Sequence, residues 1–396
     1  MSTDATTTII VSTSPTEEQF QTGQVLPIAG AHFIHDIYTS FVAPLLPVLI
    51  EKFSLSLAQA GTLNAALQIP ALLNPFIGYL ADKISLRYFV ILAPAITGTL
   101  ISSMGFAPDY FALIAILFVA GISNAAFHAP APAMIGRVAG RKVGLGMSLF
   151  MAAGELSRTA GPLLAVWAVT IWTLDGVYRT ALLGWAASIV LYLRLRLVPA
   201  RIEKPGSLSS LIPLLRSLFL PLALINLTKD FMLACLTTFL PTYRQMQGAS
   251  LLEGGIALAI FSLAGAAGAL VSGTLSDRLG RKQVLLGTII ASFLFMLIFL
   301  KVQDWLQIPI LLLLGFTSLA TAPVMLAMVQ EKLPNNRSIG NGLYMFISFL
   351  VRPITTVLIG VLGDMVGLET VFYWSSLVSL LSIPAILALP SKAKPK

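Results

Sequence analysis

Charged residues are scarce in this chain. Asp, Glu, Lys and Arg make up only 11% of the 396 residues, whereas 57% are hydrophobic. A soluble domain normally carries about 25% charged residues, and a soluble protein this apolar would expose patches large enough to aggregate. The apolar residues instead form runs of about 20 residues, long enough to cross a hydrocarbon core of about 30 Å. The composition therefore predicts an integral membrane protein.

Cysteine and a basic N-terminal segment are also lacking. The single cysteine, Cys235, excludes an intramolecular disulfide, and its position in an apolar run indicates a small core residue. The first 23 residues contain no Lys or Arg, so they lack the basic start of a secretory signal. We expect residues 1–23 to form a disordered cytoplasmic tail. The sequence contains no P-loop, so ATP hydrolysis is not the expected source of energy.

The basic residues are distributed unevenly. Of the 25 Lys and Arg, most fall in loops assigned to one side of the membrane and few in loops of the other side. This asymmetry follows the positive-inside rule and predicts that both termini are cytoplasmic. Topology thereby explains the net charge of +8, and nucleic acid is not an expected partner. We expect a multi-pass protein of the cell (inner) membrane.

The apolar runs predict twelve membrane-spanning helices, because a sheet with an open edge cannot exist in lipid. The expected spans are residues 25–50, 57–81, 88–106, 110–136, 143–172, 177–198, 213–243, 252–276, 283–301, 306–330, 339–363 and 369–390. A polar stretch around Pro205 and Gly206 divides them into two groups of six. The expected parts are the tail (1–23), an N-terminal bundle (24–198), a cytoplasmic linker (199–212), a C-terminal bundle (213–390) and a basic cytoplasmic tail (391–396).

The two halves of the chain repeat each other. A shift of 194 residues places Asp36 on Asp230 and Arg158 on Arg352. Such internal similarity predicts a repeated architecture, and parallel six-helix repeats related by an axis along the membrane normal are known in transporters. The expected fold is therefore all-α, with twelve transmembrane helices in two pseudo-symmetric six-helix bundles.

A loop with glycine, aspartate and basic residues occurs once in each half. Its characteristic residues are Gly78, Asp82, Lys83 and Arg87 in the first copy and Gly273, Asp277, Arg278 and Arg281 in the second. Both copies resemble the G-x-x-x-D-R/K-x-G-R-R/K loop of the major facilitator superfamily. The resemblance implies a gate, in which the aspartate pairs with basic residues or caps a helix end and favours one arrangement of the halves. The alternative is an ordinary pair of basic cytoplasmic loops.

Three segments of the first half carry a narrower resemblance. They read G-A-H-F-I-H-D at residues 30–36, F-H-A-P at residues 127–130, and G-E followed by G-P within residues 154–162. Together they resemble the fosmidomycin-resistance type of efflux carrier, although Ala131 stands where that family usually has an acidic residue. Gly161 and Pro162 also resemble part of an antiporter signature, of which half of the glycines are missing.

Ionisable side chains lie inside the predicted spans. Each costs about 2.5–3.5 kcal/mol at the bilayer centre, so such residues usually face a bundle interior or a water-filled cavity. They are His32, His35, Asp36, His128, Glu155, Arg158, Lys229, Asp230 and Arg352. With neutral histidines, the three cations balance the three carboxylates, as a low-dielectric interior favours.

Helical spacing places several of these residues in pairs. The pairs that share a helix face are His32 with Asp36, Asn124 with His128, Glu155 with Arg158, and Asn226 with Asp230. They are candidates for a transport path, which the resemblance implies is lined by the first, fourth, seventh and tenth helices. The alternatives are a structural ion pair for Glu155 and Arg158 and a packing network for His32 and Asp36. A metal site lacks supporting cysteine or carboxylate spacing, so no metal or cofactor is expected.

These observations predict a secondary carrier rather than an enzyme. The candidate proton-coupling residues are Asp36, His32, His35, Asp230 and Glu155. The candidate substrate-binding residues are Asn124, His128, Arg158, Asn226, Lys229 and Arg352. We favour proton-coupled efflux of a small organic, drug-like or anionic compound by alternating access. The alternatives are uptake of an organic anion or sugar-like solute, by symport or facilitated diffusion, and a membrane receptor or scaffold that does not transport. Expected partners are the lipid bilayer, a small-molecule substrate and protons, with a monomeric protein.

Overall fold

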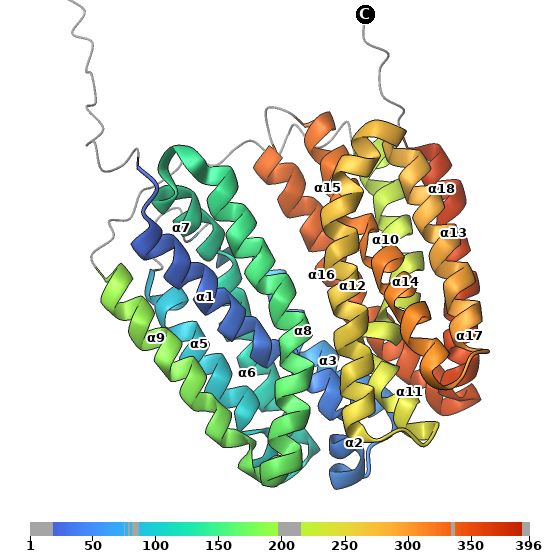
Figure 1. The fold of residues 1–396 in the computed structure, drawn as a ribbon, viewed down its shortest axis with the longest axis horizontal. Helices are drawn as coiled ribbons and strands as arrows, with labels where there is room; N and C mark the ends of the chain where they lie inside the picture. Colours follow the sequence, from blue (N-terminus) through green and yellow to red (C-terminus); the bar gives the residue numbers. More distant parts are fainter. Residues whose placement is uncertain are drawn as a thin grey trace, which may run out of the picture.

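The computed structural model of the chain describes residues 19–74, 76–77, 80, 87–196, 215–333 and 337–389. Within these residues the regular structure is entirely helical, as the apolar spans predict. Figure 1 shows two bundles of helices, one from each half of the chain. The first helix begins and the last helix ends on the same side of the molecule, which we call the terminal face. The bundles diverge toward this face and meet at the opposite one, the distal face.

The N-terminal bundle contains most of the first six predicted spans. Its elements are α1 (Thr22–Thr39), α2 (Val42–Phe53), α3 (Leu57–Gln68), η1 (Ile69–Leu73), α5 (Arg87–Ser102), η2 (Met104–Phe106), α6 (Tyr110–His128), α7 (Ala131–Val138), η3 (Gly140–Lys142), α8 (Val143–Gly176), η4 (Val177–Thr180) and α9 (Ala181–Leu195). Three of these predicted spans are broken in the structure, the second of them where α3 gives way to η1 at Ile69. The first divides between α1 and α2, where Pro44 has no N–H with which to continue the hydrogen bonds of α1. The fourth divides before α7, where Pro130 has no N–H to donate to the carbonyl of Ala126, four residues earlier.

The C-terminal bundle contains the other six spans. Its elements are η6 (Leu215–Phe219), α10 (Leu220–Ala234), η7 (Cys235–Phe239), α11 (Leu240–Met246), α12 (Leu251–Leu279), α13 (Arg281–Phe299), η8 (Asp304–Leu306), α14 (Gln307–Leu319), α15 (Thr321–Lys332), α16 (Arg337–Val366), α17 (Leu368–Leu380) and α18 (Ser382–Ala388). The seventh span contains a π-helical turn, η7, before Pro241. Proline lacks the N–H that would bond to the carbonyl four residues earlier, so the helix widens there.

The helices are long and apolar enough for a membrane. Nine stretches of the described residues meet this requirement, and one of them, Leu145–Leu195, holds both α8 and α9. The shorter apolar helix α5 and the interrupted α3 occupy the two remaining predicted spans. The prediction of twelve membrane-spanning helices in two pseudo-symmetric bundles is therefore confirmed. The predicted linker, residues 199–212, and the basic tail, 391–396, lie outside the described residues.

Glycines bring the two bundles into direct contact. Helix α3 packs along α16, and α8 packs along α12. A Cβ atom on Gly61 of α3 would lie 2.7 Å from the carbonyl oxygen of Thr356, and one on Gly255 of α12 would lie 2.7 Å from a methyl carbon of Val166. A larger residue at either position would force the helices apart.

A carboxylate also joins the bundles at the distal face. The first N–H groups of α3, on Leu57 and Ala58, donate to the two carboxylate oxygens of Asp364 in α16, at 2.7 and 2.8 Å. The next N–H, on Gln59, donates to the hydroxyl of Ser56 at 3.2 Å. A carboxylate is favourable at a helix N-terminus because it satisfies unpaired N–H groups and opposes the positive end of the helix dipole. Asp364 therefore stabilises the closed distal face.

We expect Asp364→Asn to open the distal face more often, because the amide is uncharged and has one acceptor oxygen. The ratio of open to closed protein should rise roughly tenfold. Spin labels on Phe106 and Trp305, exposed at the distal ends of the two bundles, would report this as a longer distance after replacement of the buried Cys235. Asp175→Asn is the control, because Asp175 pairs with Lys52 of its own bundle at 2.7 Å. An equal change in both variants would contradict the role of Asp364.

Candidate transport site

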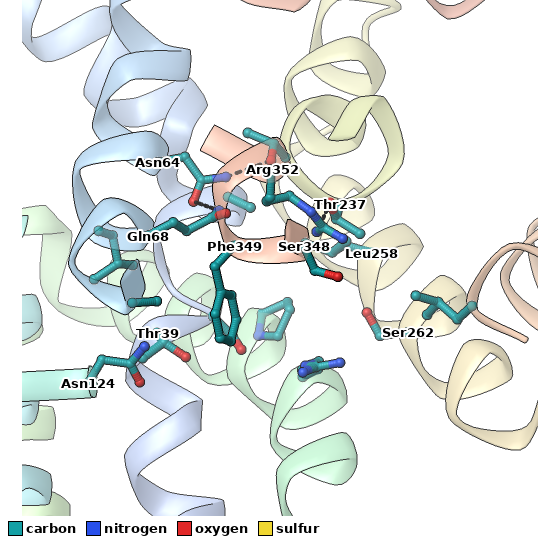
Figure 2. Close-up of a pocket in the computed structure, with 18 residues that line it drawn as sticks. Thr39, Asn64, Gln68, Asn124, Thr237, Leu258, Ser262, Ser348, Phe349 and Arg352 are labelled. Atoms are coloured by element: carbon teal, nitrogen blue, oxygen red, sulfur yellow. Dashed lines mark hydrogen bonds between the residues drawn. The ribbon is translucent and has the colours of Figure 1, made fainter. Parts of the chain in front are cut away.

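A cavity of about 360 Å³ lies between the two halves. This volume falls within the range of small-molecule sites. The N-terminal half contributes Asn64, Gln68 and Asn124, and the C-terminal half contributes Thr237 and Ser262 (Figure 2). Among the described residues, the only charged ones in the lining are two arginines, one from each half. The cavity therefore combines neutral hydrogen-bonding groups with positive charge, a combination suited to an organic anion.

The two arginines, Arg158 of α8 and Arg352 of α16, occupy equivalent positions of the repeat. One Arg158 nitrogen, Nη1, donates to both carboxylate oxygens of Glu155, at 3.0 and 3.2 Å. Arg352 contacts Asp230 at 3.1 Å and the hydroxyl of Thr237 at 3.4 Å. A guanidinium carries five N–H donors, so each arginine keeps donors for a bound anion.

The second half holds its buried carboxylate in a fixed ion pair. One oxygen of Asp230 contacts Arg352, and the other accepts from the hydroxyl of Thr355 at 2.9 Å. The neighbouring amide of Asn226 donates to Ser348 at 3.2 Å. Because arginine does not deprotonate in proteins, Asp230 has a permanently charged partner. Lys229 is buried, makes no hydrogen bond or ion pair with the described residues, and does not line the cavity.

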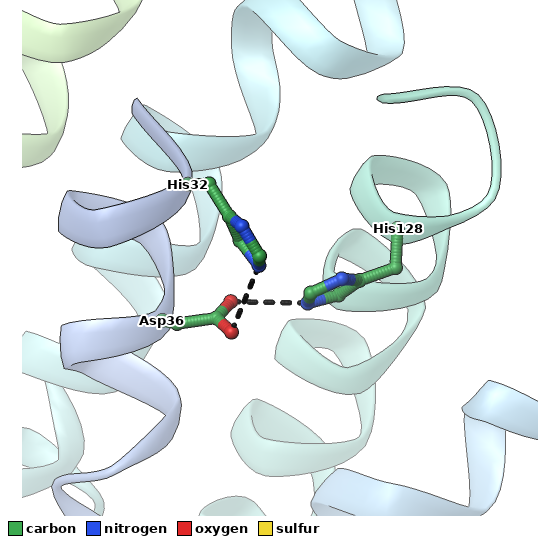
Figure 3. A group of neighbouring side chains, drawn as sticks. All are labelled: His32, Asp36 and His128. Carbon is green, nitrogen blue, oxygen red and sulfur yellow. Dashed lines mark hydrogen bonds and ion pairs between the residues drawn. The ribbon is translucent and has the colours of Figure 1, made fainter. Parts of the chain in front are cut away.

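The first half surrounds the equivalent carboxylate with imidazoles. One oxygen of Asp36 lies 3.2 Å from Nε2 of His32, and the other lies 3.0 Å from Nε2 of His128 (Figure 3). His35 Nδ1 is also 3.0 Å from the second oxygen. Asp36 and His35 are buried, whereas the His128 side chain is 29% exposed. Among the described residues, the ion-pair partners of Asp36 are therefore all imidazoles, which exist in neutral and protonated forms.

The imidazole cluster, which we define as Asp36, His32, His35 and His128, adjoins the cavity. The hydroxyls of Thr39 and Ser40, which line the cavity, both donate to the backbone carbonyl of Asp36, at 3.0 and 2.9 Å. Asn124, one turn before His128 on α6, also lines the cavity. A proton bound by the cluster would therefore lie about one helical turn from a bound substrate.

Comparison with known proteins identifies the family. The model of the Major Facilitator Superfamily matches residues 28–352 and 222–396. The chain belongs to this superfamily. Among curated relatives, the fosmidomycin resistance protein of Escherichia coli (strain K12) is 26% identical over 385 residues, covering 94% of each chain. An MFS-type transporter of Bacillus subtilis (strain 168), YfnC, is 24% identical over 394 residues, covering 93% of each chain.

Solved structures agree on the fold. A bacterial homologue of the human lysosomal transporter Spinster superimposes with a TM-score of 0.79 at 14% identity, over 94% of this chain and 99% of that one. A D-xylose–proton symporter superimposes with a TM-score of 0.75 at 15% identity, over 94% and 99%. The predicted major facilitator fold is thus confirmed, and the protein is a membrane transporter of this superfamily.

Part of the superfamily gate loop is described. Gly78, Asp82 and Lys83 lie outside the described residues, and Arg87 begins α5. In the second copy, Arg281 pairs with Asp277 and, at 2.9 Å, with Glu331 of α15, so the loop joins α12 to α15. Arg278 is exposed.

Two glycines of the second loop differ in what surrounds them. Gly280 has a φ of +99°, which requires glycine. A Cβ on Gly273 would meet no atom within 4 Å, so no helix of the described residues approaches it in this conformation. The gating role of both loops stays a prediction.

The imidazole cluster also contains donor atoms of the kind that bind metals. The ligand atoms of His32, Asp36 and His128 lie within 4.8 Å of one another. Two imidazoles and a carboxylate suit a divalent transition metal by donor type. The carboxylate, however, contacts both Nε2 atoms directly. We therefore interpret the cluster as a proton site, and the absence of a resident metal stays a prediction.

Several neutral residues of the site were not predicted. Asn64 and Gln68 line the cavity, and Asn64 donates to Thr238 of the other half at 2.6 Å. Their spacing of four residues is the same signal that pairs His32 with Asp36, but neither side chain carries the charge that makes such a pair stand out inside an apolar span. Thr97, which contacts His35 Nε2 at 3.2 Å, carries no comparable signal.

Proposed function

We propose that this transporter exports a small organic anion in exchange for protons, by alternating access at the cavity between its halves. The observation that carries the proposal is the difference between the equivalent carboxylates. Asp230 has a permanent cationic partner, whereas Asp36 has titratable ones. The C-terminal half, with Asp230, is thereby suited to hold a fixed charge. The N-terminal half, with Asp36, is suited to take up and release a proton.

The cavity supports an anionic substrate. Its two charged lining residues are Arg158 and Arg352, and arginine binds carboxylate and phosphate-type groups through paired N–H donors. The arginines come from opposite halves, so a single anion that contacts both would draw the halves together around itself. Lys229 is buried in the same half as Arg352 but does not line the cavity. Of the predicted proton-coupling residues, Glu155 and Asp230 each pair with an arginine, which leaves the imidazole cluster as the proton site.

The direction of transport is proposed from the relatives. The curated relative from Escherichia coli is named for resistance to fosmidomycin, and export is one way in which a membrane transporter confers resistance. The distribution of basic residues favours a cytoplasmic terminal face. We accordingly place the protein in the cell (inner) membrane, as a monomer with both termini cytoplasmic. Uptake of an organic anion or sugar-like solute is the alternative.

Transport into proteoliposomes under an imposed pH step tests the proposal. The substrates would be fosmidomycin, a panel of small organic anions, and neutral compounds of matched size. We expect concentrative movement of at least one anion against the proton gradient, its collapse when a protonophore removes the gradient, and no movement of the neutral compounds.

Three other outcomes would overturn the proposal. If an anion moved in the same direction as the protons, the protein would be a symporter rather than an exchanger. Movement unaffected by the protonophore would remove the proton coupling. Vesicles that move no compound under any gradient would favour the receptor or scaffold interpretation.

A further inference from the structure

His32 is held by α8 on two sides. The ring of Phe150 stacks on its imidazole, with the ring centres 3.9 Å apart and the planes inclined by 18°. A Cβ on Gly154, one turn further along α8, would lie 2.6 Å from Cε1 of the same imidazole. The Nδ1 atom of His32 lies 2.8 Å from the carbonyl oxygen of Phe150. The orientation of this imidazole is therefore set by α8 as much as by its own helix.

The contact with Phe150 decides where His32 carries its hydrogen. A carbonyl oxygen can only accept, so Nδ1 must donate to it. A neutral imidazole has one N–H, and Nε2 would then direct a lone pair at the Asp36 oxygen 3.2 Å away. Two lone pairs at this separation repel each other. The contact is favourable only when one more proton lies between His32 Nε2 and Asp36.

The other two imidazoles need no additional proton. His128 Nε2 and His35 Nδ1, each 3.0 Å from the second Asp36 oxygen, can both donate to it as neutral rings. The remaining nitrogen of His35 lies 3.2 Å from the hydroxyl of Thr97, which also contacts the hydroxyl of Ser123 at 2.9 Å. A hydroxyl has one hydrogen, so Thr97 donates to His35 when Ser123 in turn donates to Thr97. The cluster in this conformation therefore holds one proton more than an ionised Asp36 with three neutral imidazoles.

Within the part of the chain that the structure describes, the neighbouring helices add no other charge at the cluster. Helix α1 packs against α5, α7, α8 and α9. On α8, Glu155 and Arg158 pair with each other. Arg137 and Arg194 lie in the last turns of α7 and α9, and Arg87 is the first residue of α5. The group that faces the cluster from α5 is the hydroxyl of Thr97, which does not titrate in this range.

We propose that α8 creates the proton site, with the Phe150 carbonyl fixing the tautomer of His32 and Gly154 leaving room for the ring. The inference rests on the proposed proton coupling and names the residues that position the proton. Phe150 and Gly154 are positioning residues, because they act through His32 and Asp36.

The same contact explains how the proton is released. Helix α8 packs both on α1 of its own half and along α12 of the other half, so we expect a movement of the halves to shift the Phe150 segment of α8 relative to α1. When the Phe150 carbonyl moves away from His32, the Nδ1 atom of His32 loses its hydrogen-bond acceptor. The imidazolium then gives its Nδ1 proton to water and keeps the Nε2 hydrogen, which continues to donate to Asp36. One proton is released, and the cluster returns to a neutral His32 with an ionised Asp36.

Nitrogen NMR of the purified transporter tests the protonation directly. The chain has three histidines, so protein labelled with ¹⁵N-histidine gives few ring signals, which single substitutions of His35 and His128 assign. At neutral pH we expect a His32 population with protons on both ring nitrogens. The inference would be overturned if His32 carried its hydrogen only on Nε2 throughout the pH range in which the cluster titrates.

Transport by Gly154→Ala tests the role of α8. The added methyl displaces the His32 ring from the Phe150 carbonyl, so the extra proton is held less firmly. We expect the pH at which proton-driven transport is half-maximal to fall by about one unit, a tenfold change in proton concentration. Gly30→Ala is the control, since a Cβ there, two residues from His32 on α1, meets no atom within 4 Å.

The outcomes separate this inference from the proposed function. A Gly154→Ala variant with a lower rate and an unchanged pH midpoint would overturn the role of α8, as would an equal shift in Gly30→Ala. Wild-type transport without any dependence on the proton gradient would instead overturn the proposed function. If Gly154→Ala does not fold, the NMR measurement on the wild-type protein still decides the inference.

Discussion

Asp36→Asn is expected to abolish concentrative transport, so that the substrate only equalises across the membrane. An ionised carboxylate at mid-depth costs about 2.5–3.5 kcal/mol unless it is compensated, which ties the movement of the halves to its protonation. The amide is neutral at every pH, so the halves move without a proton. Exchange of labelled for unlabelled substrate at equal pH should persist, because both cavity arginines remain. The two assays in one preparation of proteoliposomes measure coupling and movement separately.

The same substitution at the equivalent position of the repeat provides the control. Asp230 contacts Arg352 at 3.1 Å, so Asp230→Asn removes the partner of a permanent cation and leaves the imidazole cluster unchanged. We expect it to lower transport to the same extent with and without a pH gradient. The assignment of the proton site would be wrong if Asp36→Asn still concentrated substrate, or if Asp230→Asn alone removed coupling.

The helices could be predicted from the sequence because the membrane imposes one length scale on every span. All twelve predicted spans correspond to helices of the structure. The breaks inside spans could not be placed in this way, because an interruption such as that between α1 and α2 barely alters the average hydropathy. Pro44 was the available signal, but Pro162 occurs inside α8 without ending it, and the non-helical residue of α8 is Thr173.

Contacts within one helix of the site were predictable, and contacts between helices were not. The spacing rule paired His32 with Asp36 and Glu155 with Arg158, and both pairs are in contact. The same rule placed Asn226 and Asp230 on one face, yet each finds its partners on α16. Spacing along a helix carries no information on how neighbouring helices are rotated, which packing of the whole bundle decides.

The contact between the halves at Asp364 was missed for a related reason. Asp364 follows the predicted span 339–363 directly, where an acidic residue is an ordinary boundary residue. Asp364 acts only because the fold brings the first turn of α3 beside it. That turn lies more than 300 positions earlier in the chain. The repeat offered no help, because the carboxylate has no counterpart at the equivalent position in the first half, which is Thr170.

Arg352→Ala is expected to destabilise the protein and to abolish transport. It leaves the buried Asp230 without its cation, and removal of one partner of a buried pair costs about 3–5 kcal/mol. The Arg352 side chain is 29% exposed and that of Asp230 is 6% exposed, so we expect a value near the lower limit. Thermal unfolding in detergent measures the loss of stability, and binding of the transported anion measures the loss of a cavity cation.

Arg158→Ala separates the two effects. The Arg158 side chain is 53% exposed and its partner Glu155 is 28% exposed, and such solvated pairs contribute about 0–1 kcal/mol. Its loss should weaken anion binding and leave thermal unfolding almost unchanged. The double variant Asp230→Asn/Arg352→Gln should recover most of the stability, because neither side chain keeps an unpaired buried charge, but it should not recover transport. Recovery of transport in the double variant would assign Arg352 to the structure alone and would leave Arg158 as the cavity cation that binds the anion.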